Sequence, residues 1–569
     1  MSKTVDLFTK EGKELKGIPW DVYPRPLLKR DSFVNLNGEW DFCVCHKSES
    51  DVNYNRKIKV PFAPQSLLSG VNELISDTDT VYYKRTFTLP NGFKKDRVLL
   101  HFGAVDQIAE VRVNGMLLGS HSGGYNPFYF DITDCLKEAN TVEVKVIDEL
   151  DKHILPYGKQ KHKRGGMWYT PVTGIWQTVW LESVPENHIT EVSYTVSGDT
   201  VKISVKGTKN GFIIVKTPDG DIVCKLNESV AEVKLESVRY WSPEDPYLYY
   251  FTVRTDCDEV QSYFAVRNLE IKEINGIKRL CLNGEPYFFH GLLDQGYWSD
   301  GLFTPATPEL FIKDIGTAKN LGFNMLRKHI KIEPQLFYYY CDKLGIVVFQ
   351  DMINNGHYSF LRDTALPTVG MQRMSDKCLH CNRESREAFK KAMLDTVDIL
   401  KNHPSVCYWT IFNEGWGQFR ADDMYELLKS IDDTRFIDST SGWFRRKKTD
   451  VDSRHVYFKK VKLKASDKPL VLSEFGGYSY KPMGHVFNTE QTYGYAKYEN
   501  REDFVKAVCD LYKNEILPLV PKGLCAAVYT QVSDVEDETN GILSYDREVL
   551  KIEPNEFFDI SENLKRVVK

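Results

Sequence analysis

Two glutamates stand at the ends of two short apolar runs, where their carboxylates could act as a pair. Residues 405–412 open onto Asn413 and Glu414, and residues 469–473 open onto Glu474. Both runs are typical of buried strands, and a glycine follows within two residues of each glutamate, so we expect both carboxylates at the carboxyl ends of interior strands. In a parallel barrel, catalytic groups gather at that end. Two carboxylates that face one pocket can divide the roles of acid and nucleophile, as glycoside hydrolysis requires.

A simpler interpretation is that each glutamate lies beside a helix N-cap at an ordinary strand-to-helix turn. The pairing of two such sites, with Asn413 before one of them and aromatic residues around both, favours a catalytic site. In the Asn413-Glu414 pair and in Ser-Glu-Phe-Gly at residues 473–476, the sequence resembles glycoside hydrolase family 2, which contains β-galactosidases, β-glucuronidases and β-mannosidases. The resemblance implies that Glu414 is the general acid/base and Glu474 the nucleophile.

These two roles predict hydrolysis with retention of the anomeric configuration. Glu474 would attack the anomeric carbon while Glu414 protonates the departing oxygen, and Glu414 would then activate water. Such a pair of carboxyl groups lies ~5 to 5.5 Å apart. Glu474 must stay ionised, so we expect a cation or several hydrogen-bond donors next to it.

The third part of the chain, residues 268–569, reads as strands that alternate with helices. This pattern is typical of βα units, and eight candidate strands are the number that closes an α/β barrel. We therefore predict a catalytic (β/α)8 TIM barrel there. The segment 354–383 follows the third strand without a clear element of its own, and we expect it to be a wall or lid of the site. The candidate strands are residues 287–293, 323–327, 345–350, 405–412, 436–440, 455–458, 470–473 and 525–530.

Two β-rich regions precede the barrel. Residues 1–183 contain many short alternating runs with frequent turns, which favours a jelly-roll β-sandwich. The short segments at residues 36–42, 60–64 and 174–177 resemble the sugar-binding domain at the start of family 2 chains. The alternative is a purely structural sandwich. Residues 184–267 have strand spacing typical of an immunoglobulin-like β-sandwich, which we expect to act as a spacer.

Candidate substrate-binding residues follow the predicted barrel strands. Arg327 ends the second strand, and the resemblance implies that it steadies the nucleophile; an outer salt bridge is the alternative. His329 lies two residues after Arg327, so in a strand the two side chains point to the same face. The family usually has Arg-x-x-His, whereas this chain has Arg-x-His, so a sugar contact for His329 is a hypothesis. Asn413 is expected to hold the sugar 2-hydroxyl.

Four further side chains complete the predicted pocket. Tyr457 matches a tyrosine that donates to the nucleophile in the family, and a buried barrel tyrosine is the alternative. Trp443 and Tyr529 are candidate stacking platforms for the sugar ring. Asp294, after the first strand, could accept a hydrogen bond from a sugar hydroxyl.

The sugar itself is indicated only weakly. In the β-glucuronidases of the family that this sequence resembles, an Asn-x-Lys pair before a Gly-Ile/Leu motif binds the substrate carboxylate. At the matching position this chain has Glu538-Thr-Asn540 before Gly541. An acidic side chain there should repel a uronate. The large β-galactosidases carry an extra C-terminal sandwich and metal ligands that we do not recognise here. We therefore predict β-galactosidase-like specificity, with β-glucuronidase, β-mannosidase, β-glucosidase or an aglycone-selective plant-glycoside enzyme as alternatives.

Composition narrows the class of protein. The 569 residues carry a net charge of −5, which gives no reason to invoke nucleic acid or an anionic membrane as a partner. We see no signal peptide or transmembrane segment, and twelve scattered cysteines fit reduced thiols, so we expect a cytoplasmic protein. Cys378 and Cys381 resemble half a zinc site, but no second half follows, and we expect no metal and no cofactor.

The sequence thus predicts an exo-acting, retaining β-glycosidase whose partner is a small glycoside and which could form a homo-oligomer. The alternative from another class is a carbohydrate-binding protein that kept the barrel and lost the chemistry. That alternative predicts a missing or displaced glutamate, whereas Glu414 and Glu474 are both present.

Overall fold

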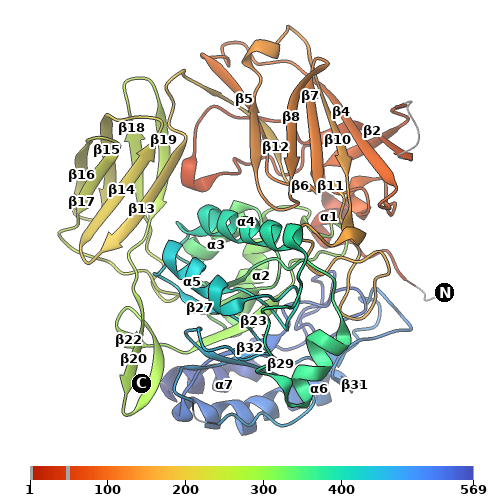
Figure 1. Ribbon diagram of the computed structural model, residues 1–569, viewed down its shortest axis with the longest axis vertical. Helices are drawn as coiled ribbons and strands as arrows, with labels where there is room; N and C mark the ends of the chain where they lie inside the picture. The colour runs from red at the N-terminus through yellow and green to blue at the C-terminus, as the bar shows by residue number, and fades with distance from the viewer. Residues whose placement is uncertain (1–3, 47–51, 465, 568–569) are drawn as a thin grey trace.

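The computed structural model describes residues 4–46, 52–464 and 466–567. Figure 1 shows three bodies: a β-sandwich in orange at the upper right, a second one in yellow to olive at the upper left, and a barrel in green to blue below them. Helix α4 (Arg383–Leu400) runs along the side of the barrel that faces the sandwiches. There, Asn126 of the first sandwich donates to Asp395 of α4 over 2.9 Å.

The first sandwich packs a six-stranded antiparallel sheet against a four-stranded one. Along β10 every second residue is buried, so Val142, Val144 and Val146 face the core while their neighbours face outward. The larger sheet contains β3 (Arg56–Val60), β2 (Gly38–His46), β4 (Asp79–Phe87), β10 (Asn140–Ile147), β7 (Ile108–Val113) and β8 (Met116–Ser122). The smaller one contains β1 (Val34–Asn35), β12 (Val179–Val184), β5 (Arg97–Phe102) and β9 (Phe128–Asp131), and β11 (Gly174–Ile175) pairs with β6 (Val105–Asp106).

The second sandwich also consists of two antiparallel sheets around its own apolar core. A three-stranded hairpin sheet then leads into the barrel and projects at the lower left of Figure 1. The strands of the sandwich are β13 (Glu191–Ser197), β14 (Thr200–Lys206), β17 (Val230–Lys234), β16 (Gly220–Leu226), β15 (Gly211–Thr217), β18 (Tyr249–Arg254) and β19 (Glu259–Phe264). The hairpin sheet is made of β20 (Leu269–Ile274), β21 (Ile277–Leu282) and β22 (Glu285–Pro286).

Eight parallel strands form the barrel, which confirms the predicted fold class. Each of the eight candidate runs contains or overlaps one strand, and the sheet runs in order from β27 to β28. The strands are β27 (Phe436–Asp438), β26 (Val406–Thr410), β25 (Val347–Asp351), β24 (Met325–Lys328), β23 (Phe289–Asp294), β32 (Leu524–Thr530), β29 (Leu470–Gly476) and β28 (Asp452–Val456).

Helices cover the outside of the barrel. Gly345, in the left-handed conformation at φ 72°, ends α3 in the way expected of a glycine cap. The segment predicted to lack regular elements forms two short helical turns, at Phe360–Ala365 and Pro367–Met371. The helices are α1 (Lys10–Glu14, before the first sandwich), α2 (Glu309–Asn320), α3 (Gln335–Leu344), α4, α5 (Ala421–Ile431), α6 (Arg501–Leu511) and α7 (Pro554–Val567), and a small sheet pairs β30 (Tyr478–Tyr480) with β31 (Ala496–Tyr498).

The alternation of side chains along the barrel strands decides which residues reach the interior. The ring of Phe289 on β23 lies 6.3 Å from that of Phe436 on β27, four strands away in the sheet, so these rings are inside the barrel. Val528 of β32 belongs to the same apolar cluster. Its neighbour Tyr529 belongs instead to the cluster between the strands and the helices.

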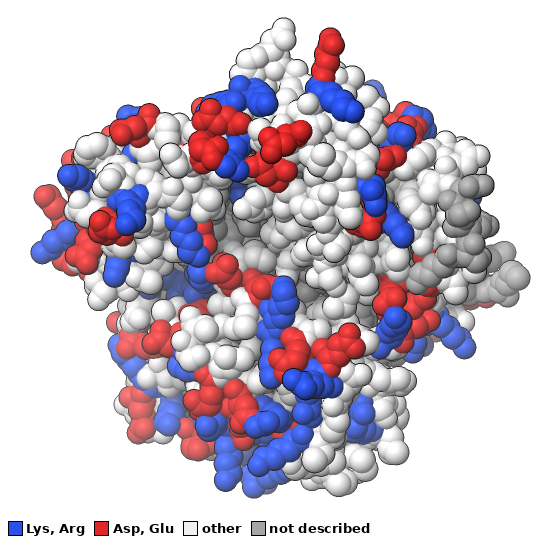
Figure 2. All heavy atoms as spheres, turned by 45° about the horizontal axis from the view of Figure 1, so that its top comes forward, with Lys and Arg blue, Asp and Glu red and all other residues white. Residues whose placement is uncertain are grey.

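The surface and the helices are those of an ordinary globular chain. On the face in Figure 2, lysine and arginine side chains lie mostly among acidic ones rather than in a patch of one sign. No helix in the described part of the chain combines the length and the apolar character needed to cross a bilayer.

Candidate active site

The fold brings Glu414 and Glu474 together. A carboxylate oxygen of each and a ring nitrogen of His455 all lie within 4.8 Å of one another. Glu474 is part of β29, and Glu414 follows β26 with its backbone in the left-handed region at φ 51°. A non-glycine residue in that region stores about 1–3 kcal/mol of strain, and such strain clusters at functional sites. Both carboxylates keep limited access to solvent.

Glu474 is surrounded by groups that favour its ionised form. Arg327 donates to Oε1 over 3.1 Å, and the Tyr457 hydroxyl donates to Oε2 over 2.5 Å. Burial raises the pKa of Glu474, but the electrostatic effects of His455, Arg327 and His329, with the hydrogen bond from Tyr457, outweigh it and hold the pKa at about 2. The carboxylate is therefore held as an anion, as a nucleophile requires.

Tyr457 remains a proton donor to that anion. Its hydroxyl also lies 2.9 Å from Oγ1 of Thr530. Burial and then the charge of Glu474 raise the pKa of Tyr457 well above its usual range. The phenol therefore stays protonated at neutral pH.

Glu414 has a different environment. Its Oε1 lies 2.7 Å from Nδ1 of His455, whose Nε2 lies 3.0 Å from the Ser441 hydroxyl. The indole ring of Trp443 meets the His455 ring edge-on at 5.6 Å. His455 is also 3.5 Å from Glu474, so one imidazole contacts both glutamates.

Arg327 links the nucleophile candidate to three other polar groups. It points into the barrel and donates to Asp351 and to Oδ1 of Asn413, each over 3.0 Å, and to the backbone oxygen of Ser473. Because Oδ1 of Asn413 accepts from Arg327, its amide nitrogen is left to donate to a sugar hydroxyl. The structure thus brings Arg327 and Asn413, both predicted from the sequence, to the glutamate pair.

His329 also lies at the pair. Its Nδ1 is 2.7 Å from Asp351 Oδ2 and 4.0 Å from Glu474 Oε1. Burial, and then the charge of Lys159, lower the pKa of His329, so the neutral imidazole is favoured. Because its Nδ1 hydrogen points to the Asp351 carboxylate, Nε2 of the neutral ring is left to accept one hydrogen bond.

For two residues, Asp294 and Tyr529, the predicted position in the pocket is wrong. Asp294 faces the helices, where one oxygen accepts from Lys328 over 2.6 Å and the other from the Gly296 backbone over 2.9 Å. Tyr529 is 1% exposed and packs edge-on against Phe475, so it offers no face to a sugar. Both side chains lie on the side of the sheet opposite to the interior, because successive residues of a strand alternate.

The sequence interpretation also missed part of the site. His455 lies two residues before Tyr457, and the two-residue period could have indicated it. Lys159, Trp168 and Tyr169 come from the first sandwich, in which the sequence predicted no individual site residue. Trp416 lies two residues after Glu414 in the sequence. Its ring stacks on that of Trp168, with the ring centres 4.9 Å apart and the planes 8° apart.

Glu538, expected to repel a uronate, is buried and hydrogen-bonded. The Tyr169 hydroxyl donates to Oε1 over 3.0 Å, and Gln531 and Asn540 donate to Oε2 over 3.0 and 3.3 Å. Burial raises the pKa of Glu538, which Lys159 and these donors partly counter. Its oxygens are therefore already engaged by the protein.

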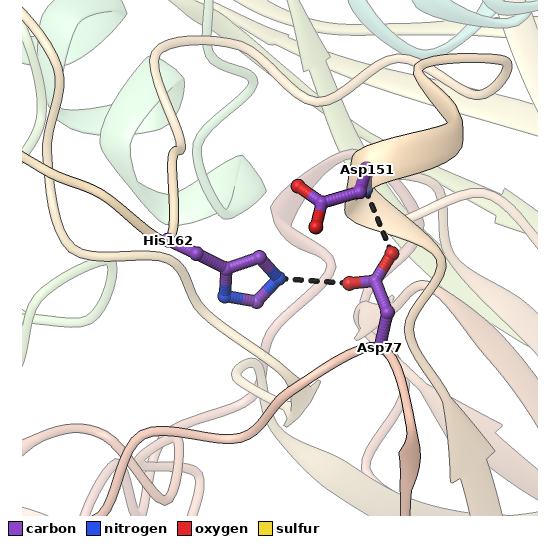
Figure 3. Close-up of side chains that lie close together, drawn as sticks. All are labelled: Asp77, Asp151 and His162. Atoms are coloured by element: carbon purple, nitrogen blue, oxygen red, sulfur yellow. Dashed lines mark hydrogen bonds and ion pairs between the residues drawn. The ribbon is translucent and has the colours of Figure 1, made fainter.

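Two groups of side chains among the described residues have donor atoms spaced for a metal ion. One is the glutamate pair with His455, where Arg327 already supplies the positive charge. The other is Asp77, Asp151 and His162 in the first sandwich, shown in Figure 3. There, Asp77 accepts from His162 and from the backbone of Asp151, both over 2.8 Å, so two hydrogen bonds account for the position of Asp77. Cys378 and Cys381 are both exposed.

Three family models match consecutive parts of the chain. "Glycosyl hydrolase 2 galactose-binding domain-like" matches residues 44–173, "Glycosyl hydrolases family 2" matches 181–267, and "Glycosyl hydrolases family 2, TIM barrel domain" matches 272–547. All three describe one family, and together they span both sandwiches and the barrel.

Curated relatives are similar at low identity. A β-galactosidase from Thermoanaerobacter pseudethanolicus is 26% identical over 71% of this chain and 54% of its own length. A β-glucuronidase from Bacteroides fragilis is 25% identical over 67% and 56%. The chain thus spans about half the length of these relatives. A β-glucuronidase from Streptococcus agalactiae is 22% identical over 96% of both chains.

Solved structures share the fold. The β-glucuronidase of Dictyoglomus thermophilum superposes with a TM-score of 0.72 at 20% identity, covering 96% of this chain and 98% of that one. The Ruminococcus gnavus β-glucuronidase in complex with uronic isofagomine gives 0.73 at 16% identity, covering 96% and 100%. At these identities the likeness establishes the architecture and leaves the sugar open.

Proposed function

Because the chain belongs to family 2 of the glycosyl hydrolases, we propose that it is an exo-acting, retaining β-glycosidase in which Glu474 is the nucleophile and Glu414 the general acid/base. One observation carries this proposal: the two carboxylates have oxygens within 4.8 Å of each other, and the surroundings of Glu474 hold its pKa at about 2. Inverting enzymes need ~6.5–9.5 Å between the two carboxyl groups to admit water, so the short separation favours retention.

The reaction proceeds in two balanced steps. Glu474 attacks the anomeric carbon, the bond to the leaving oxygen breaks, and Glu414 gives its proton to that oxygen. Glu414, now a carboxylate, takes a proton from water, whose oxygen attacks the same carbon and frees Glu474. The amide of Asn413 donates to the 2-hydroxyl, where a hydrogen bond strengthens as the oxocarbenium-like transition state forms.

For the sugar, we propose a terminal β-hexoside, with a β-galactoside as the first substrate to test. A β-galactosidase is among the similar relatives, and Glu538 keeps a carboxyl group near the pocket. The second candidate is a β-glucuronide. Two observations support this second candidate. Hydrogen bonds already engage both oxygens of Glu538, and the charge of Lys159 acts on this carboxyl group.

For the cellular setting, we propose a cytoplasmic protein that acts on small glycosides. Buried thiols such as Cys341 and Cys407 support a reducing compartment. A homo-oligomer stays a prediction, which light scattering would test.

The test is nitrophenol release from β-galactoside, β-glucuronide, β-mannoside, β-glucoside and α-arabinoside, with Glu474→Gln as the blank. We expect one or two glycosides to be hydrolysed by the native enzyme and none by the blank. Proton NMR of the first-formed sugar should show the β-anomer before mutarotation. An α-anomer would overturn the retaining assignment, and equal turnover by the blank would overturn Glu474 as the nucleophile. If no glycoside reacts, trapping with a 2-fluoro glycoside tests the nucleophile directly.

A further inference from the structure

A loop of the first sandwich reaches the catalytic end of the barrel. Residues 153–170 leave the sandwich after its last helical turn and are clamped on the barrel by Tyr157, whose backbone N–H donates to Asn354 and whose hydroxyl donates to Gly356. Within the sandwich, His162 holds the same loop to Asp77, as Figure 3 shows. The loop is therefore held to the barrel at Tyr157 and to the first sandwich at His162.

Lys159 is a cation of this loop that lies near the rings of Tyr169 and Trp416. Its Nζ lies 5.6 Å from the ring centre of Tyr169 and 5.9 Å from that of Trp416. The hydroxyl of Tyr169 is bonded to Glu538, and Trp416 is two residues from Glu414. The backbone oxygen of Lys159 accepts from the N–H of Tyr169 over 3.0 Å, which fixes where its side chain begins.

The ammonium group of Lys159 lacks a direct anionic partner in the described part of the chain. Its charge lowers the pKa of Glu538, whose oxygens accept from Tyr169, Gln531 and Asn540. The charge of Lys159 also acts on His329, which lies beside Glu474. A half-buried ammonium between two aromatic faces has lost part of its hydration. A bound anion would supply the charged partner that this ammonium lacks.

We propose that Lys159 forms a binding site for a single anionic group on the sugar held in the catalytic pocket. The group is the carboxylate of a uronic acid or a sulfate ester, both of which offer oxygens to an ammonium. The site would extend the accepted sugars from neutral hexosides to acidic ones. This inference rests on the proposed function, since it needs a glycoside bound at Glu414 and Glu474.

The experiment compares acidic and neutral substrates on the full chain. kcat/KM is measured for 4-nitrophenyl β-glucuronide, 4-nitrophenyl β-galactoside 6-sulfate and 4-nitrophenyl β-galactoside, on native enzyme, Lys159→Gln and Lys163→Gln. Lys163 is exposed on the same loop, so its variant removes an equal charge at a distance from the pocket. The measured quantity is the ratio of acidic to neutral kcat/KM within each protein, which cancels any loss of folded enzyme.

A hydrogen bond to a charged group contributes about 1.5–3 kcal/mol, so we expect Lys159→Gln to lower the ratio about 30-fold, mainly through KM, and Lys163→Gln to leave it unchanged. The substrate whose ratio falls identifies the anion as carboxylate or sulfate. An unchanged ratio in Lys159→Gln would mean that Lys159 only balances Glu538, which overturns the proposal. If the native enzyme hydrolyses the galactoside but neither acidic sugar, the inference also fails while the proposed function stands. Failure on all substrates counts against the proposed function itself.

Discussion

At the level of single residues, the pocket depends on how charge is distributed around Glu474. Arg327 contacts Glu474 and Asp351, and it is 1% exposed, so two buried carboxylates share one buried guanidinium. Buried charges are tolerated when they are paired and hydrogen-bonded, and removing one partner costs about 3–5 kcal/mol. The arrangement holds Glu474 as an anion before substrate arrives.

The lowered pKa of Glu474 predicts an acid-dependent loss of stability. Its folded pKa of about 2 lies below the ordinary 4.5, so its contribution is fully present above pH 4.5 and is lost as the pH falls toward 2. We expect the thermal midpoint of the native enzyme to fall more between pH 5 and pH 3 than that of Glu474→Gln, which has no proton to gain there. Scanning calorimetry of both proteins at each pH measures this difference. Parallel falls would mean that the pKa of Glu474 is ordinary.

The tyrosine on the nucleophile predicts a change in kcat. Tyr457→Phe removes the donor to Oε2 of Glu474 and leaves the ring, which stacks on Tyr495 at 3.8 Å. A donor on the nucleophile positions it and sets its charge, so we expect kcat to fall about 10- to 100-fold with little change in KM. Steady-state kinetics on the best nitrophenyl glycoside measures both constants. A rise in KM alone would assign Tyr457 to substrate binding instead.

At the level of elements, the sequence predicts the barrel strands well and their inward faces less well. All eight candidate runs contain or overlap strands, because buried parallel strands are short apolar runs with polar residues at their ends. Arg327, Asn413 and Tyr457 also lie where the sequence and the resemblance placed them. Asp294 and Tyr529 do not, because a shift of one residue in a strand turns a side chain from the interior to the helices.

Local sequence patterns could not predict that the first sandwich contributes residues to the site. Lys159, Trp168 and Tyr169 reach the pocket only because a loop of one domain docks on another. Periodicity reports burial within an element and carries no information about which distant surface an element meets. The same limit applies to Glu538, because its neighbours in the sequence do not indicate that Tyr169, of another domain, donates to its carboxylate.

The position of Asp294 on the helix side of β23 predicts a structural role. Asp294→Asn should weaken the buried pair with Lys328 and lower the thermal midpoint, while KM for the sugar stays near the native value. Asp351→Asn is the contrasting variant, because Asp351 faces the pocket and holds Arg327 and His329, and it should lower kcat as well. Calorimetry with steady-state kinetics separates the two. A rise in KM for Asp294→Asn would restore it as a sugar ligand.

At the level of the whole molecule, residues of two domains meet next to the catalytic pair. The barrel supplies the glutamates, and the first sandwich supplies the ring of Trp168 that stacks on Trp416, together with contacts to two buried carboxylates. Tyr169 donates to Glu538, and the backbone of Thr170 donates to Glu536 over 3.0 Å. Without the sandwich, these buried carboxylates would lose donors, and Glu538, whose pKa the charge of Glu474 affects, is one of them.

This interface predicts a measurable coupling between Tyr169 and Glu538. Tyr169→Phe removes a donor to a buried carboxyl group whose pKa burial already raises, so that pKa should rise further. In a double-mutant cycle with Glu538→Gln, we expect a coupling energy of about 1.5–3 kcal/mol, because hydrogen bonds to charged groups fall in that range. Denaturant unfolding of the four proteins gives the energies, and Tyr247→Phe, in the second sandwich, is the control. Additive losses would mean that the first sandwich and the barrel are not coupled through this contact.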